Sequence, residues 1–178
     1  GFIYLIVNDQ WRPNKALMRN LHTADPAADD AVVFEETDES FFLSAGLSQS
    51  QQLVFLHSGD HVTTEVRYVP RTNLLATPQL ISQRSTAHEY YADHQGDDAQ
   101  SGRLLIRSNL RQANFDLYQL ALDDSAGKPS TRLDPANWQN ILAGDERTYL
   151  TNHLVFREHL FVEARIDGLD QMMVVAQN

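Results

Sequence analysis

The chain contains no cysteine among its 178 residues, so neither a disulfide nor a thiolate metal site can form. Absence of cysteine fits a reducing cytoplasm, although many periplasmic proteins also lack it. We therefore expect a cytoplasmic location, with the periplasm as the alternative. No apolar run reaches the roughly 18–20 residues that a membrane-spanning helix needs. The opening segment Gly1–Val7 is too short to span and has no basic region before it, which predicts neither an anchor nor a signal peptide, and no membrane partner.

Positive charge is scarce. The sequence has 14 lysines and arginines against 24 aspartates and glutamates, a formal net charge of −10. A phosphate backbone would be repelled by this surplus, so we expect no nucleic-acid partner. A cationic peptide would be attracted, although surplus acidic charge also serves solubility alone.

The motifs of common catalytic and phosphate-binding sites are missing. The best match to a serine nucleophile elbow, Gly46–Ser50, lacks the final glycine and is predicted to be a polar turn between strands. The Gly127–Lys128 pair resembles the end of a phosphate-binding loop, but Pro129 follows it where serine or threonine is needed. We assign no catalytic residue and no cofactor, and predict that this chain alone is not an enzyme.

Histidines and carboxylates do not form a convincing metal site in the sequence. His57 and His61 have the spacing of two ligands on a helix, but a turn is predicted between them. In the segment His88–His94, alternation along a strand would separate the histidines from the carboxylates. The acidic pairs Glu35–Glu36 and Asp38–Glu39 are interpreted as solvated strand ends. Aromatic residues on strand positions are interpreted as core: Phe41, Phe42, Tyr90, Tyr91, Phe115 and Tyr118.

A repeat of two apolar runs occurs four times along the chain. The first runs are anchored at Leu5, Leu53, Leu104 and Leu160, about 50 residues apart, and a second run begins eleven residues after each anchor. A repeat of this length is typical of β-propeller blades, each a four-stranded antiparallel sheet.

Four strands can be assigned within each of the two middle repeats, because short β-branched and aromatic runs alternate with turn residues. The second repeat contains Phe41–Ala45, Leu53–His57, Thr64–Val69 and Gln79–Gln83. The third contains Glu89–Asp93, Arg103–Ser108, Phe115–Leu120 and Trp138–Leu142, joined in part by the longer loops Gln95–Gly102 and Asp123–Pro135. Along Thr64–Val69, Glu65 and Arg67 are predicted on one face and Val66 and Tyr68 on the other.

The two end repeats each lack one strand. The first has Phe2–Val7, Ala16–Leu21 and Ala31–Glu36 but no opening strand, and the last has Tyr149–Phe156, His159–Ala164 and Gln171–Ala176 but no closing strand. The predicted fold is therefore all-β: a partial β-propeller of two complete blades plus two incomplete ones, forming a single segment over residues 1–178. Because such an arc exposes blade faces and edges, we expect a piece of a larger protein, with mutual completion by copies as the alternative.

The strand order also predicts which strands line the propeller channel. In propellers the first strand of each blade is innermost, so Phe41–Ala45, Tyr90–Asp93 and Tyr149–Asn152 are expected nearest the axis. Acidic residues near these strands, such as Glu39 and Asp93, would then favour entry of basic peptides, and Glu89 would join them.

Five segments resemble the propeller domain of oligopeptidase B, a branch of the prolyl oligopeptidase family of serine peptidases: Val33–Pro70, His88–Asp97, Leu104–Asn109, Asn114–Tyr118 and His159–Val175. The most specific element is the E-x-D-x-x-[FY] step, followed by the run that contains Thr-Thr and Glu-Val-Arg. At modest identity, the resemblance covers essentially the whole chain.

The resemblance implies a two-part enzyme. A seven-bladed propeller would cap an α/β-hydrolase domain with a serine, aspartate and histidine triad, which would be the partner of this chain. The substrates would be short basic peptides cleaved after lysine or arginine, and the propeller would exclude folded proteins and take part in opening and closing. No triad residue maps onto this chain, since the hydrolase domain is absent from it. The alternative is a propeller module that binds proteins or peptides with no hydrolase partner.

Overall fold

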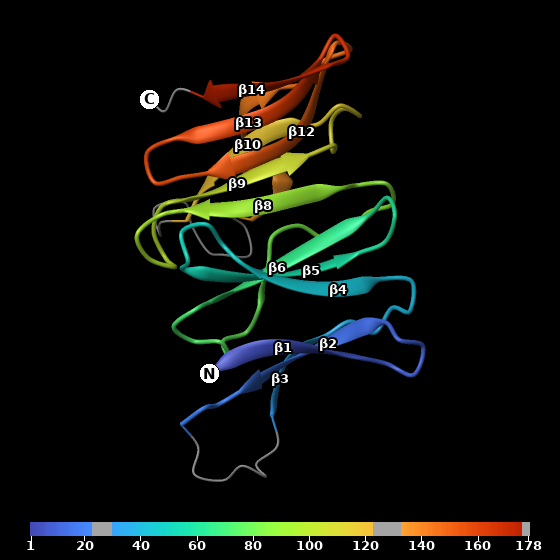
Figure 1. The fold of residues 1–178 in the computed structure, drawn as a ribbon, viewed down its shortest axis with the longest axis vertical. Coiled ribbons are helices and arrows are strands. Elements are labelled where there is room, and N and C mark those ends of the chain that lie inside the picture. The colour runs from blue at the N-terminus through green and yellow to red at the C-terminus, as the bar shows by residue number, and fades with distance from the viewer. Residues whose placement is uncertain (23–29, 123–132, 176–178) are drawn as a thin grey trace.

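The computed structural model describes residues 1–22, 30–122 and 133–175, which form four antiparallel sheets placed side by side along the long axis (Figure 1). The N-terminal sheet lies at one end of the row and the C-terminal sheet at the other. The two middle sheets have four strands and the two outer sheets have three. The predicted all-β partial propeller, with two complete and two incomplete blades, is confirmed.

Each sheet is a meander in which consecutive strands pair, because each turn returns the chain beside the strand it has just left. The first sheet contains β1 (Phe2–Val7), β2 (Pro13–Arg19) and β3 (Ala31–Glu35). The second contains β4 (Phe42–Leu47), β5 (Leu53–Gly59), β6 (Thr64–Pro70) and β7 (Gln79–Leu80). The third contains β8 (Tyr90–Gln95), β9 (Arg103–Ser108), β10 (Asp116–Ala121) and β11 (Gln139–Ala143), with the 3-10 helix η2 (Pro135–Asn137) before β11. The fourth contains β12 (Thr148–Val155), β13 (Leu160–Ile166) and β14 (Leu169–Val175).

The strands β4, β8 and β12 each form one edge of their sheet. This is the place that the first strand of a propeller blade occupies. Their position nearest a propeller axis stays a prediction. None of the described segments forms a helix long and apolar enough to cross a membrane.

The hydrophobic core consists of three clusters, each between two neighbouring sheets. Both faces of the middle sheets are therefore covered. On β6, for example, Val66 packs toward the third sheet while Val69 packs toward the first, and both are fully buried. A blade of this kind depends on its two neighbours to bury its apolar side chains.

Packing on both faces corrects part of the sequence interpretation. Glu65 is buried although it alternates with Val66 as predicted, because the first sheet covers its face. The aromatic residues divide in the same way. Phe41, Tyr90, Phe115 and Tyr118 are buried, whereas Phe42 and Tyr91 are 50% and 39% exposed on the edge strands β4 and β8. The prediction that all six belong to the core is wrong for these two.

Several strand boundaries differ from the predictions for local reasons. Phe115 precedes β10 because its φ of 61° is left-handed and breaks the extended backbone. Phe41 precedes β4 because its N–H closes a turn onto the carbonyl of Asp38. The predicted strand Gln79–Gln83 is reduced to the two residues of β7, after which the chain bends toward Arg84.

Candidate functional site

A cleft of about 1100 Å³ opens where the second, third and fourth sheets meet. The turns that follow β4, β8 and β12 line it together with the first residues of β9 and the last residues of β10. Five of its lining residues are glutamines: Gln49, Gln52, Gln95, Gln119 and Gln139. The cleft therefore combines side chains from three blades, which no single repeat of the sequence brings together.

A chain of side-chain hydrogen bonds crosses the cleft. Gln95 donates to the carbonyl of Phe156 at 2.5 Å and accepts from Arg103 Nε at 2.9 Å. Arg103 Nη1 donates to Gln119 Oε1, and Gln119 in turn donates to Gln139 Oε1 at 2.9 Å. The order of these residues follows from sheet register, because Gln95 lies directly opposite Arg103 and Gln119 directly opposite Gln139.

The register beside Arg103 depends on a glycine. Gly102 has a φ of +83°, and a Cβ at this position would lie 2.0 Å from the carbonyl oxygen of Gln95. Only a residue without a side chain fits such a close approach of two strands. Gly102 thereby lets β8 and β9 pair up to the last residue and sets Arg103 opposite Gln95.

Arg103 is a half-buried cation held by neutral partners. Within the part of the chain that the structure describes, no carboxylate lies at ion-pair distance from its guanidinium, which donates instead to two glutamine amides. Burial lowers the pKa of Arg103 from its ordinary value, although the group stays charged at every physiological pH. The side chain thus presents positive charge and spare N–H donors to the cleft.

A second hydrogen-bond group holds the other wall of the cleft. The ring of His94 lies between Ser50 Oγ, 2.7 Å from Nδ1, and the carbonyl of Ser101, 2.9 Å from Nε2. Since a carbonyl only accepts, Nε2 carries the proton and Nδ1 accepts from Ser50. Burial lowers the pKa of His94, which favours this neutral form.

The Ser50–His94 contact is not completed into a hydrolytic triad. Asp93 Oδ1 accepts from the backbone N–H groups of Gln49, at 3.0 Å, and of His94, at 2.7 Å, rather than from the imidazole ring. A triad needs the carboxylate on the ring nitrogen opposite the serine. Together these bonds clamp the turn after β4 to the end of β8, and Gly46–Ser50 ends a strand and enters a turn instead of leading into a helix.

The other residues singled out in the sequence lie apart from one another. Glu39 is exposed in the turn before β4, while Glu89 is half-buried just before β8 and does not join Asp93. His57 lies on β5, where burial lowers its pKa to about 4, and His61 is exposed in the following turn. Among the described residues no three histidine or carboxylate groups are arranged to hold a metal ion. Gly127–Lys128 and most of the Asp123–Pro135 loop lie outside the described residues.

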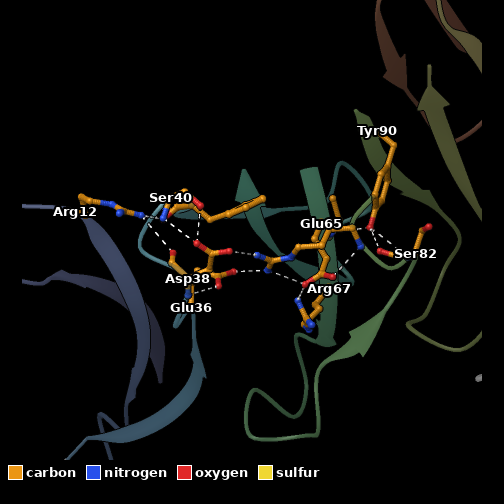
Figure 2. Close-up of polar contacts among 11 residues, drawn as sticks. Arg12, Glu36, Asp38, Ser40, Glu65, Arg67, Ser82 and Tyr90 are labelled. Atoms are coloured by element: carbon orange, nitrogen blue, oxygen red, sulfur yellow. Dashed lines mark hydrogen bonds and ion pairs between the residues drawn. The ribbon is translucent and has the colours of Figure 1, made fainter. Parts of the chain in front are cut away.

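An ion-pair cluster joins the first two sheets, contrary to the prediction that the acidic strand ends are solvated. Glu36 and Glu65 are about 5% exposed, and Arg84 Nη2 lies 2.6 Å from Glu36 and 3.0 Å from Glu65. Figure 2 shows these two glutamates approaching Arg84, Glu36 from the residue after β3 and Glu65 from β6, with Arg67 also paired to Glu65. Burial raises the pKa of both glutamates, but their hydrogen bonds and ion pairs together, with Arg84 foremost, outweigh it and leave each pKa below its ordinary value.

Sequence reasoning missed both arginines that organise these groups. Arg84 lies in a polar segment after β7, and its two carboxylate partners are 19 and 48 residues away. Arg103 stands at the start of a strand whose glutamine partners are 8 and 16 residues away. No local spacing pattern marks such contacts, because blade packing and sheet register create them.

Comparison with known proteins gives a consistent result. The family model for the prolyl oligopeptidase N-terminal β-propeller domain matches residues 1–178. Protease 2 of Moraxella lacunata is 30% identical over 172 residues, which are 97% of this chain and 22% of that protein. Dipeptidyl aminopeptidase BI of Pseudoxanthomonas mexicana is 27% identical over 154 residues, covering 84% of this chain and 19% of the relative. The chain thus spans about a fifth of the length of these relatives.

Solved structures share the fold. Oligopeptidase B from Trypanosoma brucei, with covalently bound antipain, superposes with a TM-score of 0.80 at 18% identity. Oligopeptidase B from Leishmania major superposes with the same score at 19% identity. Each match covers 97% of this chain and 22% of the solved chain.

Proposed function

Because the chain belongs to the family of prolyl oligopeptidase N-terminal β-propeller domains, we propose that it is a non-catalytic propeller portion of a serine endopeptidase that cleaves short peptides after lysine or arginine. Its partner in this proposal is the α/β-hydrolase domain of the same protein. The observation that carries the proposal is the family match over residues 1–178, supported by the blade order and by the fold shared with oligopeptidase B.

The exposed faces at both ends of the row support a place within a larger propeller. On β14, Met172 and Val174 are each at least 60% exposed, on the face opposite to that of Met173 and Val175, which pack against the third sheet. At the other end, Val32 on β3 is also more than half exposed. Apolar side chains gathered on a sheet face call for a covering neighbour. Further blades of the same propeller would bury them in the way that the middle sheets bury theirs.

The role that we propose for the propeller is selection of substrates by size. The full-length protein should cleave chromogenic peptides containing lysine or arginine, with kcat/KM falling steeply as the substrate grows into a folded protein. This chain by itself should give no turnover, because the residues that the structure describes contain no completed triad. The measurement is kcat/KM across a substrate series of increasing length, with each substrate also made without lysine and arginine. Equal cleavage of a peptide and a folded protein would exclude selection by size. Equal cleavage of substrates with and without lysine and arginine would exclude specificity for basic residues.

Acidic residues at the entry to the first strands would assist basic substrates. Asp93 is a poor candidate, since its carboxylate binds backbone N–H groups and is largely buried. We therefore assign this role to the exposed Glu39, in the turn before β4. Glu39→Gln in the full-length protein should lower kcat/KM for an arginine peptide by about twofold at low salt, and the loss should vanish at high salt. Glu158→Gln is the control, because Glu158 follows the end of β12 whereas Glu39 precedes the start of β4. An unchanged salt profile in Glu39→Gln would remove this residue from the proposal.

A further inference from the structure

We propose that the cleft around Arg103 is a binding site for a carboxylate of a short peptide, whether its C-terminal group or an acidic side chain. The whole of this site is built by the propeller blades of this chain. The ligand would enter between the turns that follow β4 and β12 and place its carboxylate on the guanidinium of Arg103.

Arg103 carries a positive charge that no carboxylate among the described residues compensates. An arginine inside a protein normally faces a carboxylate, since placing a cation away from water is costly. Here Nε and Nη1 donate to neutral glutamine oxygens, which leaves Nη2 without a partner among the described residues. The guanidinium is therefore held in place while its charge is uncompensated. A ligand carboxylate would accept from it in the charge-assisted geometry that arginine favours.

Hydrogen bonds hold the guanidinium of Arg103 in one orientation before any ligand binds. Gln95 and Gln119 each accept a hydrogen bond from it. Gln95 is itself bonded to the carbonyl of Phe156, and Gln119 to the side chain of Gln139. Two bonds to a planar group fix its orientation, so little side-chain entropy is lost when a ligand binds. An arginine that served only to cover apolar surface would not need such support.

The size and lining of the cleft indicate a peptide. Its volume of about 1100 Å³ exceeds what a single small anion needs and lies at the upper end of ligand pockets. Glutamine amides both donate and accept, which matches the alternating N–H and C=O groups of a peptide backbone. Gln49 and Gln52 bring such amides from the neighbouring blade.

The negative net charge of the chain does not prevent a carboxylate from binding in direct contact with Arg103. Asp97 and Arg157 lie at the cleft, 3.4 Å apart, and both side chains are about 80% exposed. Charges in water are screened over about 10 Å at ordinary salt, whereas a direct contact with the half-buried Arg103 is screened much less. The site thus selects a carboxylate locally within an acidic protein.

The test uses the full-length protein after its serine nucleophile has been blocked with a serine-directed phosphonate. The probes are N-acetylated, fluorescently labelled tetrapeptides without lysine or arginine: one with a free C-terminus, one with a C-terminal amide, and one amide with an internal aspartate. Fluorescence anisotropy measures Kd for each. A carboxylate-bearing probe should bind at least about tenfold more tightly than the plain amide, as expected for a charge-assisted contact. The two carboxylate probes tell a terminal source from a side-chain source.

Arg103→Gln should abolish the preference for the carboxylate probes, and Arg103→Lys should retain only part of it, because a lysine keeps the charge but loses the planar fork. Arg111→Gln is the matched control, since Arg111 is exposed in the turn between β9 and β10, at the other end of β9 from Arg103. Unchanged circular dichroism shows that each variant remains folded. Equal binding of the amide and carboxylate probes, or an equal loss in Arg103→Gln and Arg111→Gln, would overturn the proposal.

Discussion

Replacing Arg84 with glutamine should lower the free energy of unfolding by about 3 kcal/mol, because it removes the cation that binds the buried Glu36 and one of the two arginines that bind the buried Glu65. Glu36 and Glu65 come from the first and second sheets, and Arg84 binds both of them. The guanidinium also lies 4.0 Å above the ring of Phe41. The loss should therefore be localised at the contact between these sheets. Urea unfolding measures the total, and hydrogen exchange on β5 and β6 measures the local part.

The matched control is Arg147→Gln. Arg147 also forms an ion pair, with Asp167, but both side chains are largely exposed, at 75% and 49%. An ion pair between exposed side chains contributes little to stability, so this variant should unfold close to the wild type. Similar losses in the two variants would mean that Arg84 contributes no more than a surface charge.

The pH dependence gives the Arg84 prediction a second readout. The pKa values of Glu36 and Glu65 lie below their ordinary value, so in the wild type their stabilising contribution is complete above pH of about 4.5 and is lost as the pH falls through the folded values. Without Arg84, both pKa values should rise because burial is less opposed, and the rise should be larger at Glu36, since Glu65 keeps its ion pair with Arg67. Protonation then stabilises the folded variant. The difference in stability between the wild type and the variant should shrink as the pH is lowered from 7 to 4. A constant difference over this range would contradict the electrostatic explanation.

Removing the hydroxyl of Tyr90 should cost about 2–3 kcal/mol, because three backbone groups would lose their partner. The hydroxyl accepts from the N–H of Val66 at 2.8 Å and of Ser82 at 3.2 Å, and donates to the carbonyl of Ser82 at 2.6 Å. The residue is fully buried, so water cannot replace these bonds in Tyr90→Phe. Figure 2 shows the hydroxyl at the point where the second and third blades meet. Urea unfolding, with hydrogen exchange at β6 as the local readout, measures the loss.

Tyr91→Phe is the control for this experiment, since it removes the same atom from the next residue. Tyr91 is 39% exposed, and its hydroxyl has no hydrogen bond to the described residues. Its loss should stay within about 0.5 kcal/mol, as for most surface changes. If Tyr90→Phe were as mild, the buried hydroxyl would contribute no more to stability than an exposed one.

The strand order could be predicted because its signals are local. Each strand is a short run of apolar residues between turn residues, and the spacing of Leu53 and Thr64 repeats in the other blades. Meander pairing then follows, since each turn places a strand beside the one before it. The exact ends were harder to predict. The left-handed backbone at Phe115 and the turn at Phe41 come from contacts that strand propensity does not contain.

The burial of charged groups could not be predicted, because it depends on which face of one blade meets which face of the next. Glu36 follows the end of β3 and Glu65 alternates with Val66 on β6, so both have the local pattern of solvated positions, and only the contact between sheets encloses them. The cleft has the same origin, since its walls belong to three blades.

The sequence by itself determined that this protein is a row of propeller blades, because the signals for strands and turns lie in neighbouring residues. Only the tertiary structure decided where charge is enclosed. Arg84 meets glutamates 19 and 48 residues away, and the cation of Arg103 is left without a carboxylate at the edge of a cleft. The physical reason is that an ionic contact depends on distance in space, and in a blade architecture that distance is set by register and by the packing of one sheet on the next.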